Sequence, residues 1–236
     1  MLLEKGEITM TKISKKDKKS KKISEEVQSE EEVTETEEGQ QEPQASMLDL
    51  LGALQGEKQE NPEARSIMFV GPIDEEKSAD LISALLVLSQ QKPAGAERAK
   101  DIKIYISTYG GSADEMLAIY DVMNYCKQFC DIETIGLGKV MSAGTLLLAA
   151  GTKGKRRLGS HCRVMIHSVN GGSVGELHSI QNEIDQMKSL QDNYIQCLSN
   201  ETSMTKRQVQ RLINRKVNVY LSAEEAIELG LEDGVM

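Results

Sequence analysis

A serine and a histidine, each beside small or glycine residues, could together perform nucleophilic chemistry. Ser142 precedes Ala143 and Gly144 at the expected start of a helix, and His167 ends an expected strand over 163–167, in which residues 164–166 are apolar. A serine hydroxyl becomes a nucleophile when a neighbouring imidazole takes its proton. Backbone N–H groups at a helix N-terminus can then hold the negative oxygen that forms.

Each of these residues also has a simpler structural explanation. Ser142 could serve only as an N-cap, because serine is among the residues preferred there. His167 could be a core histidine whose ring is satisfied by its neighbours. Gly110 and Gly111, which follow Tyr109, could expose amide donors because no Cβ covers them. It is the combination of the three features that predicts a reactive site.

Strand and helix signals alternate from Ser66 to the C-terminus, which predicts an α/β fold. In such folds the active groups lie at the carboxyl ends of strands and at helix N-termini, where all three features fall. Strands are expected over 66–70, 102–106, 132–135, 163–167 and 217–221. Helices are expected over 113–127, 142–150 and 174–197, after Asp74 and Thr205, and from Ser222 to Gly230. Asp74, Ser112, Thr205 and Ser222 are the residues expected to cap four of them.

The N-terminal part has a different composition. Residues 1–60 hold nine basic and fifteen acidic residues, with lysines gathered over 12–22 and nine glutamates over 25–42. So few apolar side chains cannot offset the entropy of ordering the chain. We therefore predict a disordered charged tail over 1–46, a short amphipathic helix and linker over 47–65, and a folded domain over 66–236.

The overall composition argues against several classes of protein. The 236 residues carry a net charge of −9 and hold no Trp and only two Phe, so we expect no nucleic-acid partner. No apolar run approaches the roughly 18 residues of a membrane helix, and the first residues lack the apolar core of a secretory signal. The four scattered cysteines predict reduced thiols in a cytoplasmic protein, and their spacing predicts no metal site.

Two stretches of the sequence closely resemble the ClpP family, the proteolytic subunits of the ATP-dependent Clp protease. One runs from Gly138 to Gly151 around Ser142, and the other holds Arg163–His167 with the glycine pair at 171 and 172. The runs over 70–74 and 221–226 also match, so that the resemblance covers about residues 66–236. It implies a ClpP/crotonase-like fold and a serine endopeptidase. By this resemblance Ser142 is the nucleophile, His167 is the general base, and the amides of Gly111 and Ala143 form the oxyanion hole.

The resemblance also implies partners. It implies stacked heptameric rings, made of this chain alone or mixed with related chains, which touch through the helix over 174–197. Unfolded proteins and peptides would be cleaved inside the chamber that these rings enclose. ATP would be used only by a separate AAA+ unfoldase, and the chain itself would need no cofactor.

One position departs from the family pattern in the catalytic residues. The third catalytic residue of the family is an aspartate, and the corresponding position here is Asn218. An asparagine can orient an imidazole through its amide oxygen, but it brings no charge to stabilise the imidazolium, and in the Ser-His-Asp template the same change costs about 10⁴ in kcat. This asparagine keeps one alternative open, a catalytically weakened subunit that assembles with active ones. A second alternative, a crotonase-type acyl-CoA enzyme, stays open because it would share the same fold.

Overall fold

The computed structural model describes residues 65–236. The predicted charged tail over 1–46 and the predicted helix that begins at Met47 lie outside the described residues.

A seven-stranded sheet lies at the centre of the described part and confirms the α/β prediction. Its strands follow the order β1-β2-β3-β4-β7; β5 pairs with β3 and β6. All pairs are parallel except the antiparallel pair of β5 and β6. The strands are β1 (Ser66–Val70), β2 (Ile102–Thr108), β3 (Ile132–Met141), β4 (Arg156–Leu158), β5 (Arg163–Ile166), β6 (Val219–Leu221) and β7 (Gly234–Val235).

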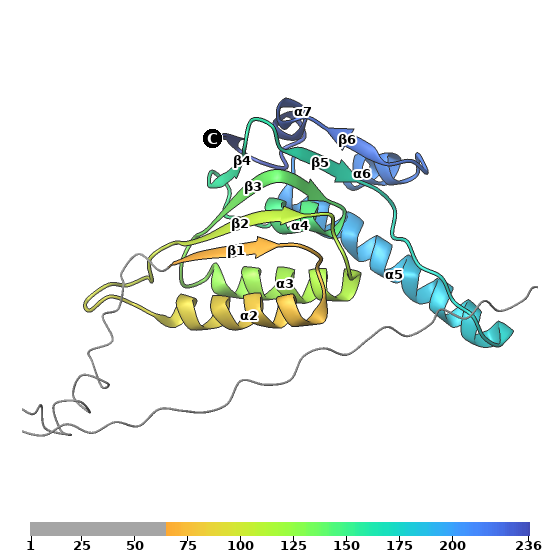
Figure 1. Ribbon diagram of the computed structural model, residues 1–236, viewed down its shortest axis with the longest axis horizontal. Helices are drawn as coiled ribbons and strands as arrows, with labels where there is room; N and C mark the ends of the chain where they lie inside the picture. The colour runs from red at the N-terminus through yellow and green to blue at the C-terminus, as the bar shows by residue number, and fades with distance from the viewer. Residues whose placement is uncertain (1–64) are drawn as a thin grey trace, which may run out of the picture. The chain divides into compact units, whose positions relative to one another are not determined.

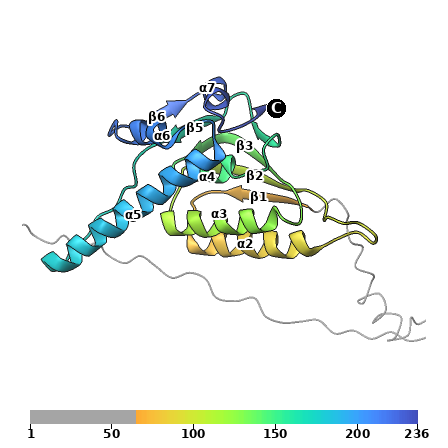
Figure 2. The same cartoon turned by 180° about the vertical axis from the view of Figure 1, so that it is seen from behind.

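Helices connect the strands and cover the sheet. Helices α2 and α3 lie side by side on one face of the sheet, and α4 follows directly after β3 (Figures 1 and 2). The predicted caps are present, since Asp74, Ser112, Thr205 and Ser222 each accept a hydrogen bond from the backbone N–H three residues later. The helices are α2 (Glu75–Gln90), α3 (Ala113–Cys126), α4 (Ala143–Ala149), α5 (Leu177–Glu201), α6 (Lys206–Ile213) and α7 (Ala223–Glu228).

Strand β3 is much longer than the predicted strand over 132–135. Its first half pairs with β4 and its second half with β5, so that one strand joins two parts of the sheet. Gly136 and Gly138 interrupt its apolar pattern, which is why the sequence predicted an early end. A Cβ on Gly136 would lie only 2.3 Å from a methyl carbon of Leu158, so glycine is required for β4 to pack there. The extension carries the chain up to Ser142.

Two short strands, β4 and β7, were not predicted, because they are short and β4 contains charged residues. Arg156 of β4 is nevertheless buried, and its guanidinium pairs with Asp233 at 2.6 Å. It also donates a hydrogen bond of 2.7 Å to the Glu201 carbonyl. A buried charge is tolerated when it is paired and hydrogen-bonded in this way.

Helix α5 begins and ends later than the predicted helix over 174–197. The three glycines at 171, 172 and 175 leave the preceding segment non-helical. Near its C-terminus the helix buries Tyr194, Ile195 and Leu198 in the core, whereas its first half extends away from the sheet (Figures 1 and 2). One side of α5 carries an apolar stripe made of Leu177, Ile180, Ile184, Met187 and Leu190. Leu177 at its start is 77% exposed and the other four are only partly buried, so the stripe is not fully covered within residues 65–236. None of the helices in this range has the length and apolar character that crossing a membrane requires.

Candidate active site

Ser142 stands at the sharp turn between β3 and α4. Its φ of 56° and ψ of −126° place a residue other than glycine in a disfavoured region of backbone space. Two hydrogen bonds to the Met165 carbonyl of β5 hold this turn: the Ser142 N–H donates at 2.8 Å, and the Thr145 hydroxyl donates at 3.0 Å. Such strain persists only where the surroundings fix the chain, and it raises the serine side chain out of the turn.

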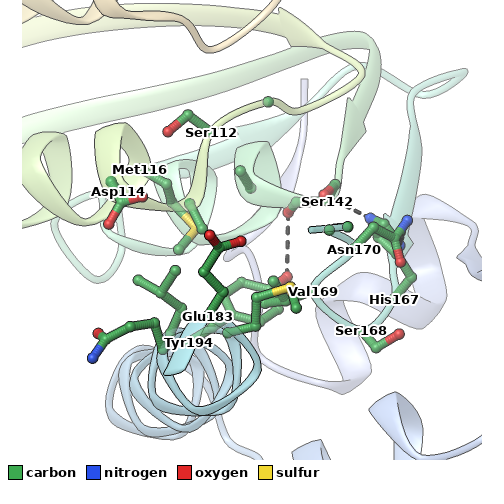
Figure 3. Close-up of a pocket in the computed structure, with 18 of the residues that line it drawn as sticks. Ser112, Asp114, Met116, Ser142, His167, Ser168, Val169, Asn170, Glu183 and Tyr194 are labelled. Atoms are coloured by element: carbon green, nitrogen blue, oxygen red, sulfur yellow. Dashed lines mark hydrogen bonds between the residues drawn. The ribbon is translucent and has the colours of Figure 1, made fainter. Parts of the chain in front are cut away.

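The hydroxyl of Ser142 faces the ring of His167. Ser142 Oγ and His167 Nε2 are 2.7 Å apart, which is a short hydrogen bond (Figure 3). Ser142 does occupy the N-cap position of α4, but its side chain makes no capping hydrogen bond. The structure therefore contradicts the explanations in which Ser142 is only a cap and His167 is only a core residue.

The environment of His167 favours a neutral ring. Burial lowers its pKa from the ordinary value of 6.5, because the charged form loses hydration there. At neutral pH the imidazole is therefore uncharged and has one nitrogen free to accept a proton. A neutral imidazole in contact with a serine hydroxyl is the arrangement that a general base requires.

The loop after β2 passes directly above Ser142. The N–H of Gly110 donates to the Thr108 hydroxyl at 2.9 Å, and the φ of Gly110 is 101°. A Cβ on Gly110 would lie 2.6 Å from the Cβ of Ser142, and a Cβ on Gly111 would lie 2.0 Å from the Ile73 carbonyl oxygen. Both positions therefore require glycine. Because these two residues have no side chain, the backbone of the loop can lie close to the Ser142 hydroxyl.

The two amides predicted to form an oxyanion hole, those of Gly111 and Ala143, flank the same cavity as Ser142. The bridge between Ile73 and this loop uses the Gly110 carbonyl and the Ser112 N–H, so it leaves the Gly111 N–H unused. Ala143 is the first residue of α4, and a first-turn N–H has no acceptor within its own helix. Neither N–H has a hydrogen-bond acceptor within residues 65–236, and the oxyanion hole that they would form stays a prediction.

The partner of His167 on its other side is Asn170. The amide nitrogen of Asn170 lies 3.3 Å from His167 Nδ1 (Figure 3). Asn218, which the sequence assigned to this place, is exposed and makes no side-chain hydrogen bond within residues 65–236. It directly precedes β6, whose register pairs Val219 with Ile166, so the next positions on the two strands are Asn218 and His167. Asn218 is thus adjacent to the site without contacting the ring.

Two further residues of the site were not identified from the sequence. Asn170 lies in a loop without a regular pattern, so only its distance of three residues from His167 could have drawn attention to it. Tyr194 of α5 donates a hydrogen bond from its hydroxyl to the Ser142 carbonyl at 3.2 Å. Burial raises the pKa of Tyr194, which keeps the hydroxyl protonated as a donor. Tyr194 thereby connects the long helix to the reactive turn.

A cavity of about 580 Å³ opens beside the two reactive residues. This is the size of a pocket that takes a small ligand or a few residues of a peptide. Its walls come from the loop after β2, the start of α3, the segment after His167, and the inner side of α5. Across residues 65–236 the structure brings no three His, Cys, Asp or Glu side chains together as metal ligands.

Comparison with known proteins places these features in a family. The model of the Clp protease family matches residues 59–236. The ATP-dependent Clp protease proteolytic subunit 2 of Thermobifida fusca is 34% identical over 171 residues, which cover 72% of this chain and 80% of the relative. The ATP-dependent Clp protease proteolytic subunit of Oltmannsiellopsis viridis is 33% identical over 194 residues, which cover 82% of this chain and 91% of the relative.

The contact between Ser142 and His167 predicts a pH-dependent reactivity of the serine. A fluorophosphonate probe should label Ser142 faster as the pH rises from about 4.5 to 8.5, because protonated His167 cannot accept the hydroxyl proton. Since burial lowers the pKa of His167, the midpoint should fall below 6.5. The measurement is the labelling rate constant against pH, with His167→Ala as the variant that should lose this dependence. A midpoint above 6.5 would contradict the described environment of the ring.

Proposed function

This chain belongs to the Clp protease family and is a peptidase, and from this premise we propose that it is a serine endopeptidase with Ser142 as its nucleophile. The observation that carries the proposal is the 2.7 Å contact of Ser142 Oγ with His167 Nε2 beside a cavity large enough for a peptide. The family resemblance supports the same two residues in the same two roles.

In the proposed reaction, His167 Nε2 takes the proton of Ser142 as Oγ attacks the carbonyl carbon of a peptide bond. The oxygen of that carbonyl becomes negative and accepts hydrogen bonds from the N–H groups of Gly111 and Ala143. His167 then returns the proton to the leaving amine, and an acyl ester remains on Ser142. Water, deprotonated by His167, hydrolyses the ester and restores the serine. The chain's own residues supply every proton transfer, so we propose no cofactor.

This mechanism requires one tautomer of His167, with the proton on Nδ1. The contact of the Asn170 amide nitrogen with Nδ1 corresponds to the opposite tautomer, because an N–H donor needs an acceptor. Rotation of the amide by half a turn presents its oxygen instead, which accepts Nδ1–H and leaves Nε2 free for Ser142. We propose that Asn170 orients the ring in this way, while Asn218 stays a candidate for the same role.

The assembly that we propose follows the family, whose members form rings with an unfoldase partner. We propose two stacked heptameric rings in the cytoplasm that enclose the cavities and admit unfolded proteins supplied by an AAA+ unfoldase, which uses the ATP. The exposed start of α5 supports a contact between the rings. Its apolar residues lie on a helix that extends from the rest of the described domain (Figure 1).

Replacing Ser142 with alanine tests the proposal directly. Ser142→Ala should lower the rate of hydrolysis of a small fluorogenic peptide by at least about 10³-fold, because the nucleophilic hydroxyl is lost. The fold should be kept, since the side chain changes little in volume. Ser160→Ala, which changes an exposed serine outside the cavity, should keep the wild-type rate. Wild-type activity in Ser142→Ala would refute the assignment. An inactive but correctly assembled wild-type chain would favour the catalytically weakened partner subunit.

Alanine variants distinguish the two asparagines. Asn170→Ala should lower kcat/KM by about 2- to 10-fold and alter its acid limb, since one hydrogen bond to the imidazole is lost. Asn218→Ala should have the smaller effect, and Asn218→Asp should raise kcat/KM because a carboxylate beside the ring stabilises the imidazolium. The measurement is kcat/KM against pH for the three variants on one substrate. A larger loss in Asn218→Ala than in Asn170→Ala would give the orienting role to Asn218.

A charge placed on the stripe of α5 tests the assembly. Ile184→Glu should convert the particle from two rings to one in native mass spectrometry, because a carboxylate would be buried at the contact between rings. Asn182→Glu adds the same charge to the other side of the helix and should leave the mass unchanged. A monomeric wild-type protein at micromolar concentration would contradict the proposed rings.

A further inference from the structure

The cavity beside Ser142 combines carboxylates with apolar side chains, and we propose that it selects peptides with lysine or arginine on the acyl side of the bond that is cut. This inference rests on the proposed function, since it places that side chain in the cavity when its carbonyl meets Ser142. It adds a substrate class that the two reactive residues alone do not specify.

Two carboxylates line the cavity from opposite walls, and neither is held in an ion pair within residues 65–236. Glu183 comes from α5, and Asp114 comes from the first turn of α3. The Glu183 side chain rises from α5 and directs its carboxylate into the space between Met116 and Ser142 (Figure 3). Asp114 lies on the α3 side of the same space, beside Met116 (Figure 3).

The lining carries no lysine or arginine to balance these two charges. Lys139 contacts the Tyr109 part of the wall: its ammonium lies 4.7 Å from the centre of the Tyr109 ring and also contacts the Ser107 hydroxyl. Lys139 is therefore already engaged by these two residues. A side chain that enters the cavity meets two negative charges and the neutral ring of His167.

The remaining wall suits a long aliphatic stem. Met116 is buried below the carboxylates, and Met187 and Leu190 of α5 continue the apolar surface. Methionine adapts its shape to an unbranched chain. Lysine and arginine bury their methylene groups along such a surface while the charged end remains with polar partners. The apolar wall can therefore contact the methylene groups of a lysine or arginine side chain, while the carboxylates contact its charged end.

Glu183 should contribute more than Asp114. The carboxylate of Asp114 stands in the first turn of α3, where the positive end of the helix dipole already stabilises it. Glu183 does not benefit from a helix dipole in this way, because it lies more than one and a half turns into α5. Its charge therefore remains available for a cation in the cavity. An acidic side chain would be repelled there, and an uncharged one of equal length would gain only the apolar contact.

Three fluorogenic peptides that differ only in the residue before the fluorophore test the inference. That residue is lysine, methionine or glutamate, so that methionine matches the lysine stem without its charge. The wild-type protein should cleave the lysine peptide with a higher kcat/KM than the methionine peptide, and the glutamate peptide most slowly. Glu183→Gln should lower the lysine-to-methionine ratio by about fivefold, the effect of one partly hydrated ion pair.

The matched control is Asp192→Asn, which neutralises an exposed carboxylate of the same helix outside the cavity and should keep the wild-type ratio. Asp114→Asn should lower the ratio less than Glu183→Gln does. A wild-type ratio of one or less, or a ratio that Glu183→Gln leaves unchanged, overturns the inference. If the methionine peptide is still cleaved in a Ser142-dependent manner, the proposed function survives that result.

A binding measurement tests the selectivity of the cavity independently of the proposed peptidase mechanism. Ser142→Ala should bind a labelled peptide amide ending in lysine about fivefold more tightly than the methionine form, as measured by fluorescence anisotropy. The difference should shrink in high salt, because the interaction is between charges near solvent. Such selectivity without any hydrolysis by the wild type would support the cavity assignment and refute the peptidase mechanism. Equal binding of both peptides would overturn the inference.

Discussion

The hydrogen bond between Ser142 and His167 depends on how β3 and β5 end next to each other. The two strands pair through Met141 and Met165, so the residues that follow them leave the sheet at the same edge. Ser142 turns sharply into α4, and its N–H returns to the Met165 carbonyl. This bond holds the strained backbone at the distance that His167 requires, because a strained conformation persists only where the surrounding structure fixes it. The length of β3, the glycine at position 136 and the short strand β4 all serve to bring the chain to this point.

Helix α5 connects the reactive turn to the outer surface of the domain. Near its C-terminus Tyr194 is buried and donates to the Ser142 carbonyl. Between that contact and the exposed N-terminus, Glu183 and Met187 line the cavity. A movement of the helix would therefore change the cavity wall and the support of Ser142 together. An assembly contact on the exposed half of α5 would thus act on the site through one rigid element, since a continuous helix transmits displacement along its axis.

The sequence was informative wherever a short local signal determined the structure. Caps at Asp74, Thr205 and Ser222 and the alternation of strands with helices predicted most elements, because these signals lie within a few residues of one another. The sequence failed where distant segments decide the outcome. Strand β4 is stabilised by the ion pair between Arg156 and Asp233, which lies 77 positions away in the sequence. Asn170, Tyr194 and Glu183 reach the site only through the path of the loop after β5 and the placement of α5. The helical pattern of α5 predicts the helix but not where it packs. Ser142 and His167 were found because each lies at an expected strand end or helix start near small or glycine residues, and the family resemblance then implied their roles.

The uncharged partner of His167 has a consequence for the chemistry. Burial already disfavours the imidazolium, and the Asn170 amide next to Nδ1 brings no negative charge to stabilise it. Both effects act on the cation that forms in the transition state, and neither acts on the neutral ring that meets the bound peptide. An interaction that is missing only in the transition state lowers kcat and leaves ground-state binding unchanged. The cavity, by contrast, contacts the substrate before the reaction begins. On the proposed mechanism, the residues around His167 therefore set the speed of cleavage, whereas on the proposed selectivity the residues of α3 and α5 set which peptide is bound.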